Sequence, residues 1–159
     1  MALGAVGPQS LASRQGREFV DECIKLAARV GFEVRDQRVV FPECGVEVDL
    51  VLENPQGIAF FAECKGSFRD RPGLQRTDTL KKAIANMVLL DACGIGPLLV
   101  LTSHRPADGV GVAMLRIAQR VAPFEVIVPR DDYRRLSRLA QADALDLAGG
   151  EWNFTRRLV

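Results

Sequence analysis

The sequence has few of the residues that build zinc sites and disulfide frameworks. Its 159 residues include four cysteines and a single histidine. Cys23, Cys44, Cys64 and Cys93 lie far apart and form no C-x-x-C pair, so neither a disulfide framework nor a zinc site is expected. Cysteines spaced in this way in a chain of this length predict a reducing, cytoplasmic setting.

Long hydrophobic runs are also missing. No apolar run reaches the roughly 18 residues of a membrane span, and the first residues have no basic region ahead of an apolar core, so neither a membrane helix nor a signal peptide is expected. With 48% apolar and 26% charged residues, the composition is that of a globular protein and excludes disorder. The length predicts a single domain, which we expect over residues 13–159, after a loose tail over residues 1–12.

A strong charge of one sign is absent from the chain as a whole, whose formal net charge is +1. The charges are nevertheless unevenly spread, because residues 65–82 hold six basic and two acidic side chains. A local basic block beside acidic residues is what a site for metal and phosphate needs. The alternative interpretation of this block is a solvated loop with scattered charge.

Hydrophobic periodicity predicts an α/β fold. Apolar residues at three- and four-residue spacing predict helices from Ser13 to Gly31 and from Thr77 to Gly94, and two further helices later in the chain. Alternating or continuous apolar runs predict strands, and the Asn54–Gly57 turn joins two of them into a hairpin. The predicted strands are 32–41 (as one strand or an irregular pair), 46–53, 58–65, 98–102 and 124–128, and the later helices are 110–120 and one that starts at Asp131 or Asp132. This order predicts a mixed sheet between helices, antiparallel first and parallel later.

The residues that point to chemistry lie on the predicted hairpin. Folding back at the turn brings Asp49 beside Glu63 on the neighbouring strand, and Lys65 lies on the same face as Glu63 because side chains alternate along a strand. Two adjacent carboxylates repel each other unless a cation lies between them. Mg²⁺ prefers oxygen ligands and is commonly held by one or two carboxylates.

These residues resemble the motif of the PD-(D/E)xK nuclease superfamily. The matching segments are Gly16–Phe19 with Glu22, Gly31-Phe32, Val48-Asp49-Leu50 and Ala62–Lys65, and the element order over most of the chain is also similar. The resemblance implies a restriction-endonuclease-like α/β/α sandwich with a central mixed sheet, an αβββαβ core and an added αβα extension. The family's proline is replaced here by Val48.

The resemblance also implies roles for particular residues. Asp49 and Glu63 become ligands of Mg²⁺, which Mn²⁺ can replace, and Lys65 assists the attacking water. A glutamate of the first helix often joins the metal site in this family; Glu22, at the edge of the apolar face, is favoured over Glu18, which lies nearer the solvent side. Glu47 is an alternative ligand, although a solvated role fits its position better.

The basic block then has a predicted partner, which is DNA. Arg69 and Arg71 follow the motif strand, and Arg76, Lys81 and Lys82 flank the start of the next helix, where backbone N–H groups also favour phosphate. The chain shows no separate recognition domain, so we expect a target set by DNA structure (a junction or flap) or by a protein partner. A homodimer would let two sites cut two strands.

Two alternatives compete with a Mg²⁺-dependent DNA nuclease of restriction or repair type. One is a non-catalytic nucleic-acid-binding or scaffolding module on the same fold. The other is a Cys64–His104 nucleophile pair, which Cys64 disfavours because it faces away from the lysine side of the strand. The choice between DNA and RNA, and between internal and terminal cutting, stays open at this point.

Overall fold

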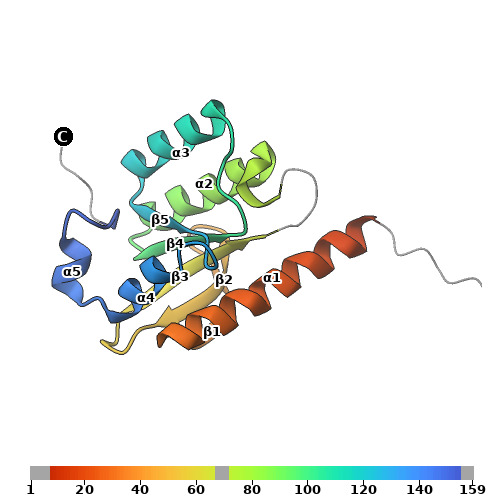
Figure 1. Ribbon diagram of the computed structural model, residues 1–159. Coiled ribbons are helices and arrows are strands. Elements are labelled where there is room, and N and C mark those ends of the chain that lie inside the picture. Colours follow the sequence, from red (N-terminus) through yellow and green to blue (C-terminus); the bar gives the residue numbers. More distant parts are fainter. Residues whose placement is uncertain (1–7, 67–71, 155–159) are drawn as a thin grey trace, which may run out of the picture.

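One five-stranded sheet with the strand order β1-β2-β3-β4-β5 forms the centre of the computed structural model, which describes residues 8–66 and 72–154 (Figure 1). The strands are β1 (Glu33–Phe41), β2 (Val46–Glu53), β3 (Ala59–Lys65), β4 (Leu98–Thr102) and β5 (Phe124–Ile127). The helices are α1 (Pro8–Val30), α2 (Thr77–Ala92), α3 (Gly109–Val121), α4 (Tyr133–Gln141) and α5 (Ala144–Ala148), with a short 3-10 turn, η1 (Gly73–Gln75). Within the two described ranges, no helix combines the length and the apolar character that a membrane span needs.

The sheet changes from antiparallel to parallel along the chain. β1, β2 and β3 form an antiparallel meander, whereas β3 pairs with β4, and β4 with β5, in parallel. Each parallel pair needs a crossover, which α2 and α3 provide. The predicted α/β class and the predicted order of strand directions are therefore confirmed.

Helices cover both faces of the sheet (Figure 1). On one face, Phe19, Cys23 and Ala27 of α1 and Leu136 of α4 are buried against the sheet residues Leu50, Leu52, Phe60 and Leu99. On the other face, α2 and α3 cover Leu98, Val100, Phe124 and Val126. Burial of apolar side chains on both faces drives the folding of this layered arrangement.

The N-terminal boundary of the first helix differs from the prediction. α1 begins at Pro8 instead of Ser13, so residues 8–12 are helical and do not belong to a loose tail. Proline is well tolerated in the first turn of a helix, where its missing N–H has no intrahelical partner to lose. Residues 1–7 lie outside the described part of the chain.

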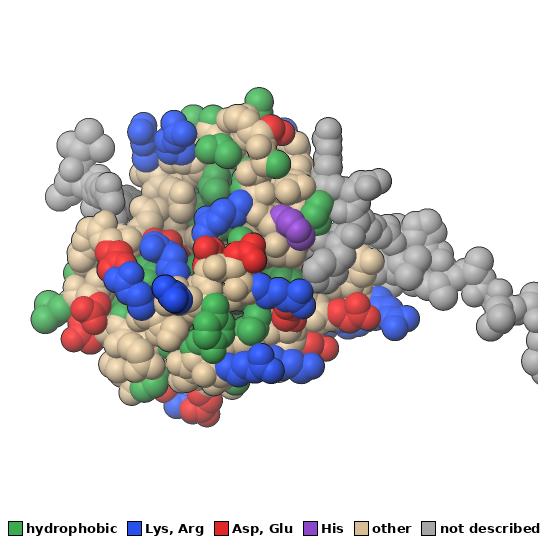
Figure 2. Space-filling view, in the orientation of Figure 1, with side chains coloured by type: hydrophobic (Ala, Val, Ile, Leu, Met, Phe, Trp, Pro, Cys, Tyr) green, Lys and Arg blue, Asp and Glu red, His purple; other side chains and the backbone are tan. Residues whose placement is uncertain are grey.

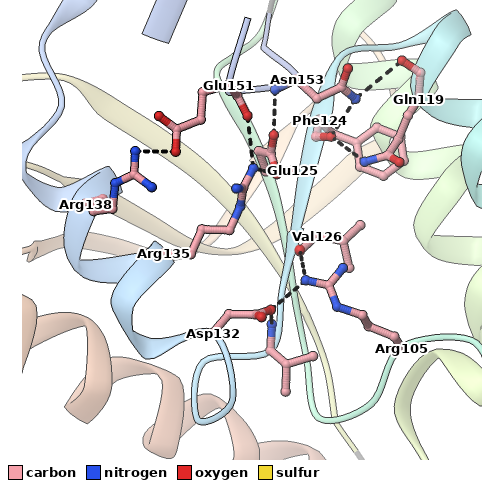
Figure 3. Close-up of polar contacts among 11 residues, drawn as sticks. Arg105, Gln119, Phe124, Glu125, Val126, Asp132, Arg135, Arg138, Glu151 and Asn153 are labelled. Atoms are coloured by element: carbon pink, nitrogen blue, oxygen red, sulfur yellow. Dashed lines mark hydrogen bonds and ion pairs between the residues drawn. The ribbon is translucent and has the colours of Figure 1, made fainter. Parts of the chain in front are cut away.

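The C-terminal segment is held on β5 by a polar network (Figure 3). Glu125 is 5% exposed and accepts hydrogen bonds from Arg135 at 3.0 Å and from the backbone N–H of Asn153 at 2.5 Å. The Arg135 guanidinium also lies 4.5 Å from the ring centroid of Trp152. A buried carboxylate is stabilised only when it is paired in this way, so the network fixes α4 and the segment after α5 against the sheet.

Candidate active site

The candidate site lies where the pairing of β2 with β3 ends. The last paired residues at this end are Leu50 and Ala62, and Asp49 and Glu63 follow directly. The Asp49 carboxylate does not lie free: its Oδ2 accepts a hydrogen bond of 2.6 Å from the backbone N–H of Cys64. The hairpin thus places Asp49 in contact with the Glu63–Lys65 segment, as expected from a chain that folds back at the Asn54–Gly57 turn.

Glu63 is a buried carboxylate with two partners from different elements. It is 2% exposed, and its Oε1 forms an ion pair with the Nζ of Lys65 two residues along the same strand. Asn86 of α2 donates from Nδ2 to both carboxylate oxygens, at 3.0 and 3.1 Å. Burial of a carboxylate is unfavourable unless it is charge-paired and hydrogen-bonded, and these contacts supply both.

Asn86, the partner of Glu63 on α2, is not among the site residues predicted from the sequence. The apolar positions of α2 that are buried include Ala83, Met87 and Leu90, and Asn86 lies at the margin of that stripe. A polar side chain at the margin of the face that a helix buries is a signal of a polar partner below it. The identity of that partner depends on how α2 packs over β3, which periodicity does not report.

Lys65 is held in place through its backbone at the end of β3. The hydroxyl of Thr102 on β4 donates to the carbonyl oxygen of Lys65 at 2.8 Å. The next residue, Gly66, approaches α1 so closely that an added Cβ would lie 1.9 Å from Cγ of Phe19. The motif strand is therefore fixed between α1 on one side and β4 on the other.

The structure places Glu22 apart from Asp49. Asp49 lines a cleft with Arg17 and Asp21 on one flank of α1, whereas Glu22 lies on the opposite flank and pairs with Arg130. Among the described residues, no group of three or more Asp, Glu, His or Cys side chains is placed to hold a metal ion. Glu22 is apart from Asp49 because of the direction in which α1 crosses the sheet, which turns the flank with Asp21 towards β2.

The other acidic candidates are paired at the surface. Glu18 forms an ion pair of 3.0 Å with Arg14, one turn away on α1. Glu47 forms an ion pair of 3.1 Å with Arg38 on β1, in agreement with the solvated role that its position predicted. Exposed pairs of this kind contribute little to stability.

The basic block is described only in part. Lys81 and Lys82 are exposed near the start of α2, and Arg76, just before that helix, pairs with Asp78 at 3.3 Å. Arg69 and Arg71 lie in residues 67–71, outside the described part of the chain. Lys81 and Lys82 are thus the members of the block that the structure places on the surface of α2.

The four free cysteines lie as two neighbouring pairs, Cys23 with Cys64 and Cys44 with Cys93. Cys44 donates from Sγ to the carbonyl oxygen of Phe41 at 3.7 Å. The hydrogen bond with Cys23, burial, and the nearby carboxylates of Asp49 and Glu63 raise the pKa of the Cys64 thiol well above its usual range. A nucleophilic cysteine needs the opposite shift, so the raised pKa of Cys64 disfavours a Cys64–His104 nucleophile pair.

Comparison with protein-family models, with curated proteins and with solved structures gave no match. The resemblance to PD-(D/E)xK nucleases therefore depends on the motif residues of this chain and on their arrangement.

The site offers two carboxylates, Asp49 and Glu63, in different surroundings. Asp49 is half-buried and lines an open cleft, whereas Glu63 is enclosed and has a lysine beside it. Mg²⁺ is often held by one or two carboxylates, keeps several waters, and takes its remaining ligands from a substrate phosphate. Asp49 and Glu63 supply oxygen donors of this kind from neighbouring strands, Asp49 in the cleft beside α1 and Glu63 beneath α2.

Proposed function

We propose that the protein is a Mg²⁺-dependent nuclease that hydrolyses phosphodiester bonds in DNA. One observation carries the proposal: Asp49 contacts the backbone of the segment in which the buried Glu63 is paired with Lys65. An acidic residue and an acid–lysine pair that meet at the open end of a hairpin are expected for metal-assisted phosphoryl chemistry. The exposed Lys81 and Lys82 on the next helix support a polyanionic substrate.

Each residue of the site has a distinct role in this proposal. Asp49 and Glu63 would hold the ion, which supplies Lewis-acid stabilisation of the phosphate and lowers the pKa of a bound water. Asn86 keeps the Glu63 carboxylate in one orientation through its two hydrogen bonds. Lys65, fixed at the strand end by Thr102, places a positive charge where the phosphate gains negative charge in the transition state.

The test is nicking of supercoiled plasmid by the full chain in Mg²⁺, in Mn²⁺ and in EDTA. We expect nicking in either metal and none in EDTA, and loss of nicking in Glu63→Gln, because the substitution removes a ligand charge. Glu47→Gln is the matched control, since Glu47 is an acidic side chain of the same hairpin that pairs with Arg38 at the surface. Equal nicking by Glu63→Gln and the wild type would overturn the proposal.

One observation favours an alternative, a nucleic-acid-binding module without catalysis. Both oxygens of Glu63 accept from Asn86 and one also pairs with Lys65, so the carboxylate already has full protein partners. In that case the protein would bind plasmid, junction, flap or single-stranded DNA and cleave none of them in Mg²⁺ or Mn²⁺. The same substrate panel identifies the preferred target if cleavage does occur.

A further inference from the structure

A cavity of about 300 Å³ opens beside the candidate site, on the α1 side of the sheet. Its walls come from α1 and from the segments that follow β4 and β5, and they combine apolar and polar groups. The apolar groups include Leu26 and Val128, and the polar ones include Thr102 and His104. The charged groups of the lining are Glu22, Arg130 and Asp131. This volume is at the lower end of the roughly 300–1,000 Å³ found for small-ligand pockets, so it has room for one planar group.

The cavity and the end of β3 lie along the same edge of the sheet. Thr102, which pairs with Lys65, lines the cavity, whereas the Lys65 side chain points with Glu63 towards the α2 side of the sheet. Lys65 pairs with Thr102 across β3 and β4, and the β4–β5 pairing of Leu101 with Ile127 brings Thr102 beside Val128. Neighbouring strands are about 4.8 Å apart, so Lys65 and Val128 are separated by roughly 10 Å along one edge of the sheet. A nucleic-acid strand that crosses this edge of the sheet from a phosphate at Lys65 would therefore bring a neighbouring nucleotide to the cavity.

His104 gives the cavity an unused hydrogen-bonding group. Its Nδ1 atom is buried and has no partner among the residues that the structure describes. The backbone carbonyl oxygen of His104 already accepts a hydrogen bond of 3.0 Å from the N–H of Leu74. Buried polar atoms without a partner are uncommon, and a ligand in the cavity would satisfy this one.

The cavity continues outward into a larger cleft of about 590 Å³ between α1 and the start of α4. The two share Glu22, Leu26 and Arg130, and the outer cleft adds Glu18, Lys25, Arg29 and the exposed ring of Tyr133. Arg130 pairs with Glu22 and Arg14 pairs with Glu18, whereas Lys25 and Arg29 form no ion pair with an acidic residue of the described chain. Figure 2 shows this mixture of charged and hydrophobic side chains on the face that carries α1 and α4.

The rim of the cleft is held in one conformation before any ligand binds. Asp132 accepts hydrogen bonds from the backbone N–H of Val128 at 2.8 Å and from Arg105 at 2.6 Å (Figure 3). Arg105 also donates to the carbonyl oxygen of Val126 at 2.9 Å. These bonds fix the turn between β5 and α4, which carries Arg130, and a fixed rim lowers the entropy lost on binding.

We propose that this cleft binds one unpaired nucleotide of the DNA strand next to the phosphate at Lys65. The base enters the inner cavity between Leu26 and His104, and the backbone phosphates lie on Lys25 and Arg29. A base that is paired and stacked in a duplex cannot enter such a cavity, so the cleft selects single-stranded ends, flaps or junctions. The inference depends on the proposed function for its substrate, and it adds the class of DNA structure on which the protein acts.

The experiment measures binding without cleavage, by fluorescence anisotropy in EDTA. The probes are a labelled single-stranded oligonucleotide and a blunt hairpin duplex of the same length, and the variant is Lys25→Gln/Arg29→Gln. We expect the wild type to bind the single strand at least about tenfold more tightly than the duplex, and the variant to lose this preference because two phosphate contacts are removed. The matched control is Arg116→Gln/Arg120→Gln, which makes the same charge change on α3 and should keep the preference.

A second variant tests the inner cavity. His104→Phe keeps an aromatic ring of similar size and removes the nitrogen, so we expect single-strand affinity to fall severalfold while duplex affinity is unchanged. A wild type that binds single strand and duplex equally would overturn the inference, as would a preference that survives Lys25→Gln/Arg29→Gln. Plasmid nicking in Mg²⁺ is a separate measurement. Nicking without a preference for single strands would contradict the nucleotide-binding cleft but not the nuclease activity. A preference for single strands without nicking would contradict the nuclease activity but not the cleft.

Discussion

At the scale of single residues, the carboxylates of the candidate site differ in their surroundings. Glu63 is enclosed by Lys65 and Asn86, whereas Asp49 is half-buried and accepts one backbone hydrogen bond. A charge change at Asp49 should therefore affect chemistry much more than folding.

We predict that Asp49→Asn abolishes Mg²⁺-dependent nicking and leaves the fold intact. The asparagine oxygen can still accept from the N–H of Cys64, so the free energy of unfolding in EDTA should change by no more than about 1 kcal/mol. Urea unfolding and plasmid nicking measure the two effects. Full activity of this variant would contradict the assignment of Asp49 as a metal ligand.

A second residue-scale prediction concerns Cys64 and pH. Because the pKa of the folded Cys64 thiol is raised, the folded protein keeps a proton that the unfolded chain releases above its ordinary pKa of about 8.5. The contribution to the free energy of unfolding is complete below that pH and is lost as pH rises towards the folded pKa. We expect the stability difference between the wild type and Cys64→Ala, measured by urea unfolding from pH 7 to pH 10, to shift steadily against the wild type above about pH 8.5. A constant difference would show that the thiol does not titrate differently in the two states.

At the scale of elements, the contact between α1 and the end of β3 positions Lys65. Gly66 has no room for a side chain because the ring of Phe19 lies against it. Gly16, near the middle of α1, has open space and is the natural control, since nothing lies within 4 Å of an added Cβ.

We predict opposite effects for the same substitution at these two glycines. Gly66→Ala should destabilise the fold by about 1–3 kcal/mol, because Phe19 or the strand end must move, and it should reduce nicking by displacing Lys65. Gly16→Ala should stabilise the protein by roughly 0.5–1 kcal/mol, because alanine loses less conformational freedom in a helix. Thermal unfolding compares the variants. A stabilising Gly66→Ala would contradict the close packing of α1 on β3.

At the scale of the whole molecule, the net charge is small, but the surface carries two separate basic regions. Lys81 and Lys82 lie on α2, on one face of the sheet, and Lys25 and Arg29 lie on α1, on the other. If the protein holds DNA across the sheet edge, both regions contact phosphates.

We predict that Lys81→Gln/Lys82→Gln weakens duplex binding and lowers the slope of log K against log salt by about 2 at most. Arg76 is a poorer choice for this test because it is already paired with Asp78. Base preference should be unaffected, since phosphate contacts carry no sequence information. A salt titration in EDTA measures the slopes, with Arg116→Gln/Arg120→Gln as the charge-matched control. Equal slopes for the wild type and the lysine variant would identify these lysines as a solvated surface.

The sequence by itself determined the elements of this protein and the pairing of its hairpin. Hydrophobic period and turn residues are local signals, so the strands around Asn54–Gly57, the helix after Thr77 and the approach of Asp49 to the Glu63–Lys65 segment could be predicted. The basic residues that follow the motif were visible for the same reason, although Arg69 and Arg71 lie outside the described residues.

Only the tertiary structure decided which side chains share a site. The side of α1 that faces β2 depends on the direction in which the helix crosses the sheet, and that direction places Asp21 near Asp49 and Glu22 beside Arg130. The same holds for Asn86, whose partner depends on how α2 packs over β3, and for the pairing of Cys23 with Cys64. Periodicity reports which residues of a helix are buried, but the packing of one element on another sets which residues they meet.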